Sequence, residues 1–232
     1  MSEGVSVILG LMLGYCVVSL SEAFFHRAVG HAGPRVRRAW RAMGFFGLPF
    51  RQAWYRHHVV HHRLTFRRDQ EAQFSGSEEE ARLRRRLTSR RHVWALEGDY
   101  GVRVGGPVAF VRFVMPTLPG FGLLCWFGGG WFTAGALVAL ALMPLASEFV
   151  HPCIHMPSAR AAKETAWLRP LLRMRYFSFI AAHHRLHHQH PSYNFNLLPG
   201  GDWLLGCHRR AEVGGRGSFA STRTKPKVDS IS

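Results

Sequence analysis

Cysteine and acidic residues are scarce in this chain of 232 residues. The four cysteines, Cys16, Cys125, Cys153 and Cys207, show no CxxC spacing, so we predict buried thiols rather than a disulfide framework or a thiolate metal site. Only 14 acidic residues stand against 30 lysines and arginines, and the formal net charge is +16. Such a basic excess indicates either nucleic acid or an anionic membrane surface as a partner.

Two segments almost free of charge favour the membrane. Residues 5–20 contain no charged residue, and with residues 21–25, where Glu22 is the one charge, they reach the ~20 residues that a bilayer core requires. This segment is predicted to be a membrane span and not a signal peptide, because Glu3 replaces the positive n-region and no clear cleavage pattern follows. Residues 113–147 contain no charge at all, and one helix of that length would overshoot a hydrocarbon core of about 30 Å.

The second segment is therefore expected to fold back on itself. The predicted turn is at residues 128–130, three consecutive glycines, which leaves one span over residues 107–127 and another over residues 131–151. Pro116 and Pro119 lie in the first of these, so it either crosses with a kink or is re-entrant. In both cases the chain returns to the side on which it entered.

The basic residues are unevenly distributed. Residues 27–103 hold seventeen arginines and seven acidic residues, whereas the N-terminus and the glycine turn hold no basic residue. The positive-inside rule then places the basic segments in the cytoplasm. Residues 39–58 and 166–184 mix arginine with apolar residues, and we expect interfacial helices there or, alternatively, ordinary soluble amphipathic helices. Residues 78–91 are expected to form a solvated or headgroup-facing helix, and no RNA-binding module accompanies the charge, which argues against nucleic acid.

Histidine, by contrast, is abundant and clustered. Residues 57–62 read "HHVVHH" and residues 183–188 read "HHRLHH". In each, a histidine is followed at +3 and +4 by two more, which on an α-helix share one face. Convergent neutral imidazoles are ligands for transition metals, so each cluster predicts part of a metal site.

Two further histidine pairs stand at the predicted membrane exits. His151 and His155 are four residues apart and share a helix face. His26 and His31 are five apart, which a regular helix would splay by about 140°, and we expect a helix end near Gly30 to swing His31 back. The four histidine boxes predict a metal site built from His26, His31, His58, His61, His62, His151, His155, His184, His187 and His188.

These motifs resemble the fatty acid hydroxylase and sterol desaturase superfamily of integral-membrane, non-haem di-metal oxygenases. The resemblance runs from Glu22 to about Gly206 and includes "EAFFHRAVGH", "YRHHVVHH", "HPCIH" and "HHRLHHQHPSYNFNLLPGGDWLLG". The last segment is similar to the family's closing pattern of HxxHH, Asn-aromatic-Asn, a Trp-Asp or Asp-Trp pair and Leu-Gly. Two features depart from the family: the segment between His62 and His151 is long, and "GGDW" reverses the commoner order.

The resemblance implies an all-α integral membrane protein. Its expected architecture is about three transmembrane spans, one plus a hairpin, with a cytosolic helical cap that holds the metals and with interfacial helices. The family positions match the ten histidines named above, and they imply two iron ions, with zinc as a possible substitute in purified protein, and molecular oxygen as oxidant. We expect one membrane-embedded domain over residues 1–213 and a disordered polar tail over residues 214–232.

The implied activity is hydroxylation of a lipid C–H bond in a fatty acyl, sphingoid or sterol-like substrate. The three-residue gap of "HPCIH" resembles lipid and sterol members more than carotenoid hydroxylases. Desaturation on the same metal centre is the alternative. A metal transporter is disfavoured, because its ligands would lie midway through the spans. Because no haem or flavin motif accompanies the boxes, electrons are expected from a separate donor such as a ferredoxin or a cytochrome, attracted to the basic face.

Several polar residues are candidates for supporting the ligands. Glu22 and Glu148 stand one turn before His26 and His151, so each is expected to accept a hydrogen bond from its imidazole or to pair with an arginine. Three residues of the closing motif are expected either to orient ligands or to cap loops: Asn194, Asn196 and Asp202. The remaining histidines are expected outside the ligand set: His57 and His183 beside it, His190 near it, and His92 and His208 at the surface.

Overall fold

Every regular element in the described part of the chain is a helix. The computed structural model describes residues 2–66, 77–86, 100–104, 110–111, 114–155, 167 and 169–210. The elements are α1 Glu3–Phe25, η1 His26–Gly30, α2 Pro34–Ala42, α3 Leu48–Trp54, η2 Tyr55–Thr65, α4 Ser77–Arg86, η3 Met115–Thr117, α7 Leu118–Leu145, η4 Ala146–Val150, α8 His151–Ile154, α10 Arg169–Leu172, α11 Arg175–Gln189 and α12 Gly201–Leu204. The predicted all-α class is confirmed for these residues.

Two helical segments are long and apolar enough to cross a membrane by length and composition. They are Glu3–Gly30, with 28 residues, and Met115–Ile154, with 40 residues. The first contains the whole of the first predicted span. The second begins inside the segment predicted for residues 107–127, of which residues 107–109 and 112–113 lie outside the described part of the chain.

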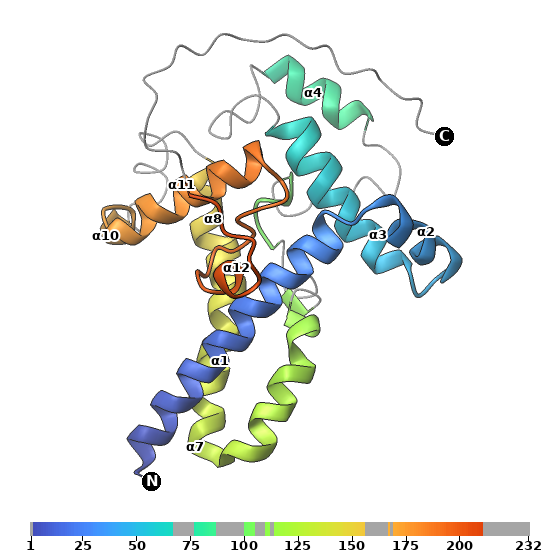
Figure 1. Ribbon diagram of the computed structural model, residues 1–232. Helices are drawn as coiled ribbons and strands as arrows, with labels where there is room; N and C mark the ends of the chain where they lie inside the picture. Colours follow the sequence, from blue (N-terminus) through green and yellow to red (C-terminus); the bar gives the residue numbers. More distant parts are fainter. Residues whose placement is uncertain are drawn as a thin grey trace.

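The second long helix is bent into a hairpin, as predicted. Within α7, Gly129 has φ 71° and ψ −179°, a conformation that only glycine adopts readily. Figure 1 shows α7 descending, reversing at the foot of the molecule and rising again beside α1. Pro116 and Pro119 do not kink this helix, because each stands in the first turn of its element, η3 or α7, where a missing N–H leaves no helical bond unmade.

Small residues hold α1 against α7. A Cβ atom on Gly10 would lie 2.0 Å from the carbonyl oxygen of Phe132, and one on Gly135 would lie 2.0 Å from the carbonyl oxygen of Val7. The two backbones are therefore in contact, without side chains between them. Packing through small residues is typical of helix pairs in membranes, where apolar burial alone does not drive association.

A leucine at Gly10 is expected to force α1 and α7 apart. Since the added side chain meets backbone atoms of Phe132, the helices must move, and overpacking of this kind costs about 1–3 kcal/mol. Gly122→Leu is the matched control, because a Cβ there meets nothing within 4 Å. Thermal unfolding in detergent micelles should show a lower midpoint for Gly10→Leu only, and equal midpoints in the two variants would contradict the close packing.

The end of the molecule opposite the hairpin is where the remaining helices meet. In Figure 1, α11 crosses above the upper part of α1 and beside α8, and η2 rises from α3 on the other side. One hydrophobic core joins this end to the helical stem formed by α1 and α7, and it contains Val18, Met143, Ile154, Ile180 and Leu197. The core fixes α1, α8 and α11 relative to one another and thereby positions the histidines that they carry.

The other sequence predictions have mixed outcomes. Residues 39–58 are helical in α2, α3 and η2 except for a turn at residues 43–47, and much of 166–184 is helical in α10 and α11. Helix α4 covers the described part of the arginine-rich segment. No disulfide joins the four cysteines, all of which lie in the described residues, as predicted. Cys153 and Cys207 are buried as expected, but Cys16 is exposed on α1 and Cys125 is only half-buried on α7. The predicted tail, residues 214–232, and His92 lie outside the described residues.

Candidate metal centre

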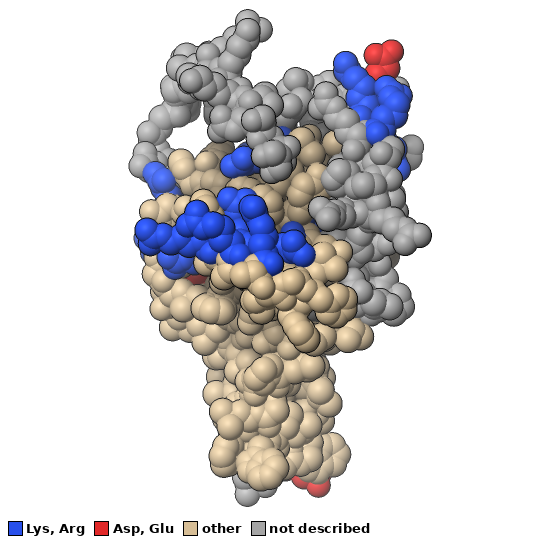
Figure 2. All heavy atoms as spheres, turned by 90° about the vertical axis from the view of Figure 1, so that its right-hand side faces the viewer, with Lys and Arg blue, Asp and Glu red and all other residues tan. Residues whose placement is uncertain are grey.

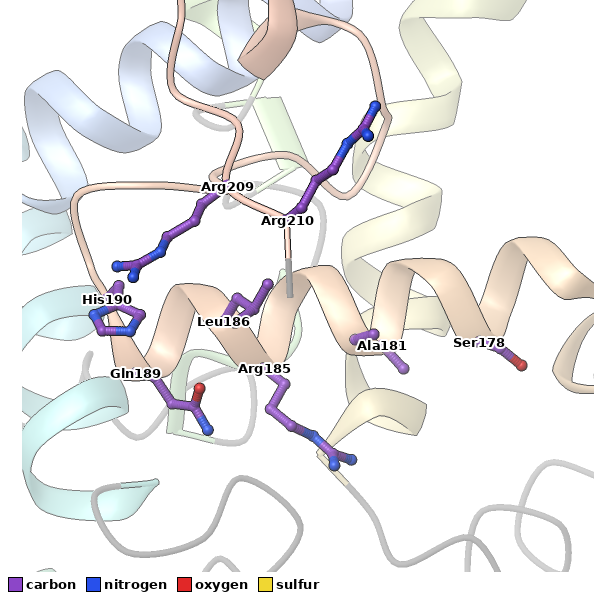
Figure 3. A pocket seen from close by; sticks show the side chains of 9 residues that line it. Ser178, Ala181, Arg185, Leu186, Gln189, His190, Arg209 and Arg210 are labelled. Carbon is purple, nitrogen blue, oxygen red and sulfur yellow. The ribbon is translucent and has the colours of Figure 1, made fainter. Parts of the chain in front are cut away.

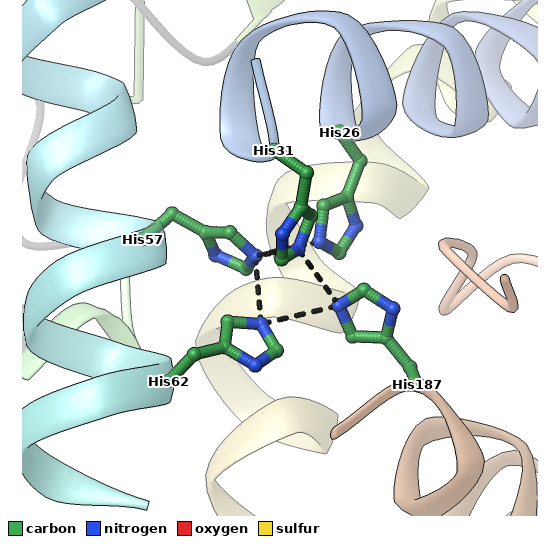
Figure 4. Close-up of side chains that lie close together, drawn as sticks. All are labelled: His26, His31, His57, His62 and His187. Atoms are coloured by element: carbon green, nitrogen blue, oxygen red, sulfur yellow. Dashed lines mark hydrogen bonds between the residues drawn. The ribbon is translucent and has the colours of Figure 1, made fainter. Parts of the chain in front are cut away.

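Histidine side chains from four parts of the chain converge where α1, η2, α8 and α11 meet. Their ring nitrogens form three overlapping groups, and within each group the nitrogens lie no more than 4.8 Å apart. We call them the five-histidine group (His26, His31, His57, His62 and His187), the four-histidine group (His61, His151, His155 and His184) and the linking group (His61, His62 and His188). Figure 4 shows the five-histidine group, with rings from three separate segments pointing to one centre.

A widened helical turn brings His26 and His31 together. Residues His26–Gly30 form a π-helical turn, η1, in which the N–H of His31 donates to the carbonyl oxygen of His26 at 3.1 Å. Because a π turn joins residues five apart, the two rings stack with centroids 5.4 Å apart and do not splay. The helical segment ends at Gly30, as the sequence predicted, and the wider turn before it brings His31 back beside His26.

The same geometry decides which histidines of η2 lie beside one another. This segment, Tyr55–Thr65, is π-helical and not α-helical. Residues five apart therefore share a side, and His57 Nε2 lies 3.0 Å from His62 Nε2. His57, expected outside the ligand set, belongs to the five-histidine group. His58 is in none of the groups, but its Nδ1 lies 3.1 Å from Nδ1 of His31 and its ring stacks on Trp54. The spacing of His57 and His62 repeats that of His26 and His31, a signal that the α-helical rule overlooked.

The four-histidine group has the spacing of nitrogens that share one ion. The Nε2 atoms of His151, His155 and His184 form a triangle with sides of 3.0 to 3.1 Å. Nitrogens bound to one metal ion at about 2.0–2.1 Å stand about 3 Å from one another. His188 Nε2, at 3.1 Å from His184 Nε2, continues the arrangement toward the linking group.

Backbone carbonyls fix the protonation of three rings. In each case Nδ1–H donates to a carbonyl oxygen, which in a neutral imidazole leaves Nε2 with a lone pair and no proton. Those Nε2 atoms point at other histidine nitrogens, so each lone pair is placed where it could be shared with a cation. The pairs are His26 with Phe195 at 2.6 Å, His151 with Val102 at 2.8 Å and His187 with Tyr193 at 2.8 Å.

His61 gives an independent indication of a metal. Its side chain is fully buried, and neither ring nitrogen has a hydrogen-bond partner among the described residues. A buried polar group without a partner is costly. A metal ion bound between the four-histidine group and the linking group, to both of which His61 belongs, would satisfy the ring.

Six histidines outside the candidate spans are held in the form that binds metal. Burial, followed by the charge that neighbouring imidazoles would carry, lowers the pKa of each ring well below its ordinary value of 6.5. Neutral rings keep a free lone pair at physiological pH. The histidines with this strong depression of the pKa are His57, His61, His62, His184, His187 and His188.

The two glutamates contact backbone and not imidazole, which corrects the expectation for Glu22. Its carboxylate accepts the N–H groups of Leu197 at 2.8 Å and Leu198 at 3.0 Å. Glu148 accepts the N–H of Val104 at 2.9 Å and lies 3.6 Å from the Arg103 guanidinium. For Glu148 the arginine alternative is thus the observed one, together with a backbone contact that sequence spacing did not predict.

Residues 194–202 of the closing motif are joined to one another by hydrogen bonds. Asp202 accepts the N–H groups of Phe195 at 3.0 Å and Asn196 at 2.8 Å, and it also pairs with His183 Nε2 at 2.9 Å. His183 therefore lies outside the metal groups, as predicted. Asn194, with φ 57°, exchanges hydrogen bonds with the backbone of Arg209.

Two other histidines lie outside the metal-binding groups. His208 is half-buried against the His183 ring and not at the surface, and His190 is exposed at the end of α11.

A basic pocket lies on the side of α11 that faces away from its metal-group histidines. Its volume is about 530 Å³, and no acidic residue lines it among the described residues. Figure 3 shows Arg185, Arg209 and Arg210 around it, with Gln189 and His190 at the end of the helix. A helix with its side chains is about 10–12 Å across, so this pocket is separated from the metal groups by one helix.

No family model, no curated protein and no solved structure matches this chain. The resemblance to the hydroxylase and desaturase superfamily therefore depends on the motifs themselves. The convergence of the histidines provides the physical basis for a functional proposal.

Proposed function

We propose that this protein is a membrane-bound oxygenase of the fatty acid hydroxylase and sterol desaturase type, which hydroxylates a lipid C–H bond at a histidine-ligated pair of iron ions. The observation that carries the proposal is the pair of histidine groups joined by the linking group. An all-imidazole donor set with unprotonated Nε2 atoms suits iron, and zinc is a possible substitute in purified protein. Two reduced irons supply the activation of oxygen and the removal of hydrogen from an unactivated carbon.

The protein's own residues position the metals and keep water away. Carbonyl groups hold the rings of His26, His151 and His187 in one tautomer. Phe66 and Phe195 are buried beside the histidines, with the Phe66 ring centroid 4.1 Å from that of His155. Such apolar walls limit the access of water and suit a hydrocarbon chain better than a polar substrate.

The surface of the helical stem supports a place in the membrane. Trp126 and Phe127, beside the hairpin turn, are 84% and 79% exposed, and Met12 and Val138 also point outward. Large exposed apolar surfaces are uncommon on soluble proteins. We place α1 and the two arms of α7 as three crossings, with the histidine groups at the cytoplasmic end, in accord with the positive-inside rule.

The α2–α3 region fits the level of the lipid headgroups. Phe45 and Phe46, in the turn between these helices, are 81% and 77% exposed. Figure 2 shows a band of arginine side chains above the narrow, largely uncharged stem. Aromatic and basic side chains at this level suit the interface of an anionic leaflet. The exposed arginines of α2 are Arg35, Arg38 and Arg41.

The basic pocket beside α11 is the proposed approach for a separate electron donor. It presents Arg185, Arg209 and Arg210 one helix away from the metal groups. An acidic ferredoxin or cytochrome would be attracted to such a surface, and electrostatic attraction mainly accelerates association. The protein also needs a lipid substrate from the bilayer, whereas nucleic acid has no part in the proposal.

The test is turnover of the iron-loaded protein in lipid nanodiscs with a ferredoxin, its reductase and lipid extract. We expect consumption of oxygen coupled to a product that has gained one oxygen atom, whereas desaturation would remove two hydrogens from the substrate. Rising salt should slow the donor-dependent rate by screening the arginines. A protein that holds two irons and turns over no fatty acyl, sphingoid or sterol substrate would refute the proposed reaction.

A further inference from the structure

Two glutamates occupy equivalent positions in the two halves of the metal centre. Glu22 precedes His26 by one helical turn, and Glu148 precedes His151 by one turn. His26 belongs to the five-histidine group and His151 to the four-histidine group. Neither glutamate hydrogen bonds to its histidine directly. Each contacts a separate segment of backbone that reaches that histidine.

Glu22 is connected to His26 through the loop that follows α11. The carboxylate accepts the N–H of Leu197 at 2.8 Å, and the carbonyl oxygen of Phe195, two residues earlier, accepts Nδ1–H of His26 at 2.6 Å. The Glu22 carboxylate also accepts the side-chain amide of Asn196 at 3.0 Å. The loop is thus fixed to α1 at the glutamate and at the histidine.

Glu148 is connected to His151 in the same way through residues 102–104. The carboxylate accepts the N–H of Val104 at 2.9 Å, and the carbonyl oxygen of Val102, again two residues earlier, accepts Nδ1–H of His151 at 2.8 Å. The Arg103 side chain adds a hydrogen bond to the carbonyl oxygen of Glu148 at 2.9 Å. In both cases the N–H that meets the glutamate and the carbonyl oxygen that meets the histidine lie two residues apart, so one short segment contacts both positions of the helix.

We infer that Glu22 and Glu148 are positioning residues, each of which holds one metal-binding group in shape through a backbone carbonyl. The carbonyl bond keeps the proton on Nδ1 and directs the unprotonated Nε2 toward the metal. If the carboxylate is removed, the segment loses its anchor, and the carbonyl no longer fixes the ring. Since the two groups have no histidine in common, each glutamate governs one metal position separately.

The inference rests on the metal-binding part of the proposed function and not on the reaction. Glu22→Gln and Glu148→Gln are nearly isosteric, but an amide has one acceptor oxygen in place of two and adds N–H groups. These would face a backbone N–H beside Glu22, and the Arg103 guanidinium or the N–H of Val104 beside Glu148. The full-length protein is loaded with Co²⁺ alone, and metal content, the cobalt absorption bands and chelator competition are measured. We expect each variant to keep one tight metal ion and to bind the other about 10–100-fold more weakly.

Combination with ligand variants shows which position is affected. Glu22→Gln should add nothing to the metal loss of His26→Ala, but together with His151→Ala it should weaken both positions. Glu148→Gln should show the opposite pattern. Glu3→Gln, at the exposed start of α1, is the control and should bind both ions as the wild type does.

The outcomes separate the inference from its alternatives. Wild-type affinity at both positions in both glutamine variants would overturn it, and so would an effect of Glu148→Gln on the group that contains His26. Glu148 has a side chain that is 33% exposed, so its variant provides the test if Glu22→Gln does not fold. A wild-type protein that binds two ions without hydroxylating lipid refutes the proposed reaction and leaves this inference intact.

Discussion

Substitution of His187 by alanine is expected to abolish tight metal binding at the five-histidine group, and turnover with it. His187 Nε2 lies 3.2 Å from the Nε2 atoms of both His31 and His62, and its Nδ1 is fixed by the carbonyl of Tyr193. Loss of a group that hydrogen bonds to a metal ligand typically lowers metal affinity 10–100-fold. Loss of a ligand itself should lower it by more than about 100-fold. No other described side chain of α11 can take its place, because His184 and His188 belong to the other groups.

His190→Ala is the matched control for this variant. It removes an imidazole near the same end of α11, but one that is exposed and belongs to none of the groups. Elemental analysis of purified protein should show one metal ion fewer per chain in His187→Ala and no change in His190→Ala. Retention of both ions by His187→Ala would mean that the five-histidine group is not a metal site.

The metal-free protein is expected to unfold steeply in mild acid. Burial depresses the pKa of six histidines well below 6.5 in the folded state, so the unfolded chain binds more protons as the pH falls below that value. Each such group lowers the free energy of unfolding by about 1.4 kcal/mol per pH unit. Six together approach about 8 kcal/mol per unit, against a total stability of about 5–15 kcal/mol. The free energy of unfolding is therefore highest above pH 6.5, and it falls as the pH drops below that value.

Near-ultraviolet circular dichroism of chelator-treated protein in detergent micelles measures this transition. We expect cooperative loss of signal within about two units below pH 6.5, and a shift to lower pH when metal is bound, because protons and metal compete for the same nitrogens. His61→Leu should make the transition less steep by about one proton, because it removes one of the six titrating rings. The substitution breaks no hydrogen bond to the described residues, because neither nitrogen of His61 makes one there. A metal-free protein that remains folded at pH 4 would show that the rings are not buried together.

Much of the fold was predictable because it depends on local composition. The uncharged segments predict one long helix and a helical hairpin, and three consecutive glycines predict the reversal that Gly129 makes within α7. The close approach of Gly10 to Phe132 could be known only from the structure, because the sequence does not reveal which face of α1 meets α7. The absence of disulfides followed from the spacing of the cysteines, while the exposure of Cys16 depended on helix packing.

The sequence by itself determined that this chain carries four histidine boxes, two of them at the ends of apolar segments, because residue types and spacings are properties of the chain. The tertiary structure decided which histidines converge. Spacing rules assume α-helical turns, but η1 and η2 are π-helical, and the register of a helix depends on what packs against it. This change of register brings His57 into the centre and leaves His58 outside the groups. The contacts of Glu22 and Glu148 were equally hidden, because their backbone partners are distant in sequence and adjoin them only after folding.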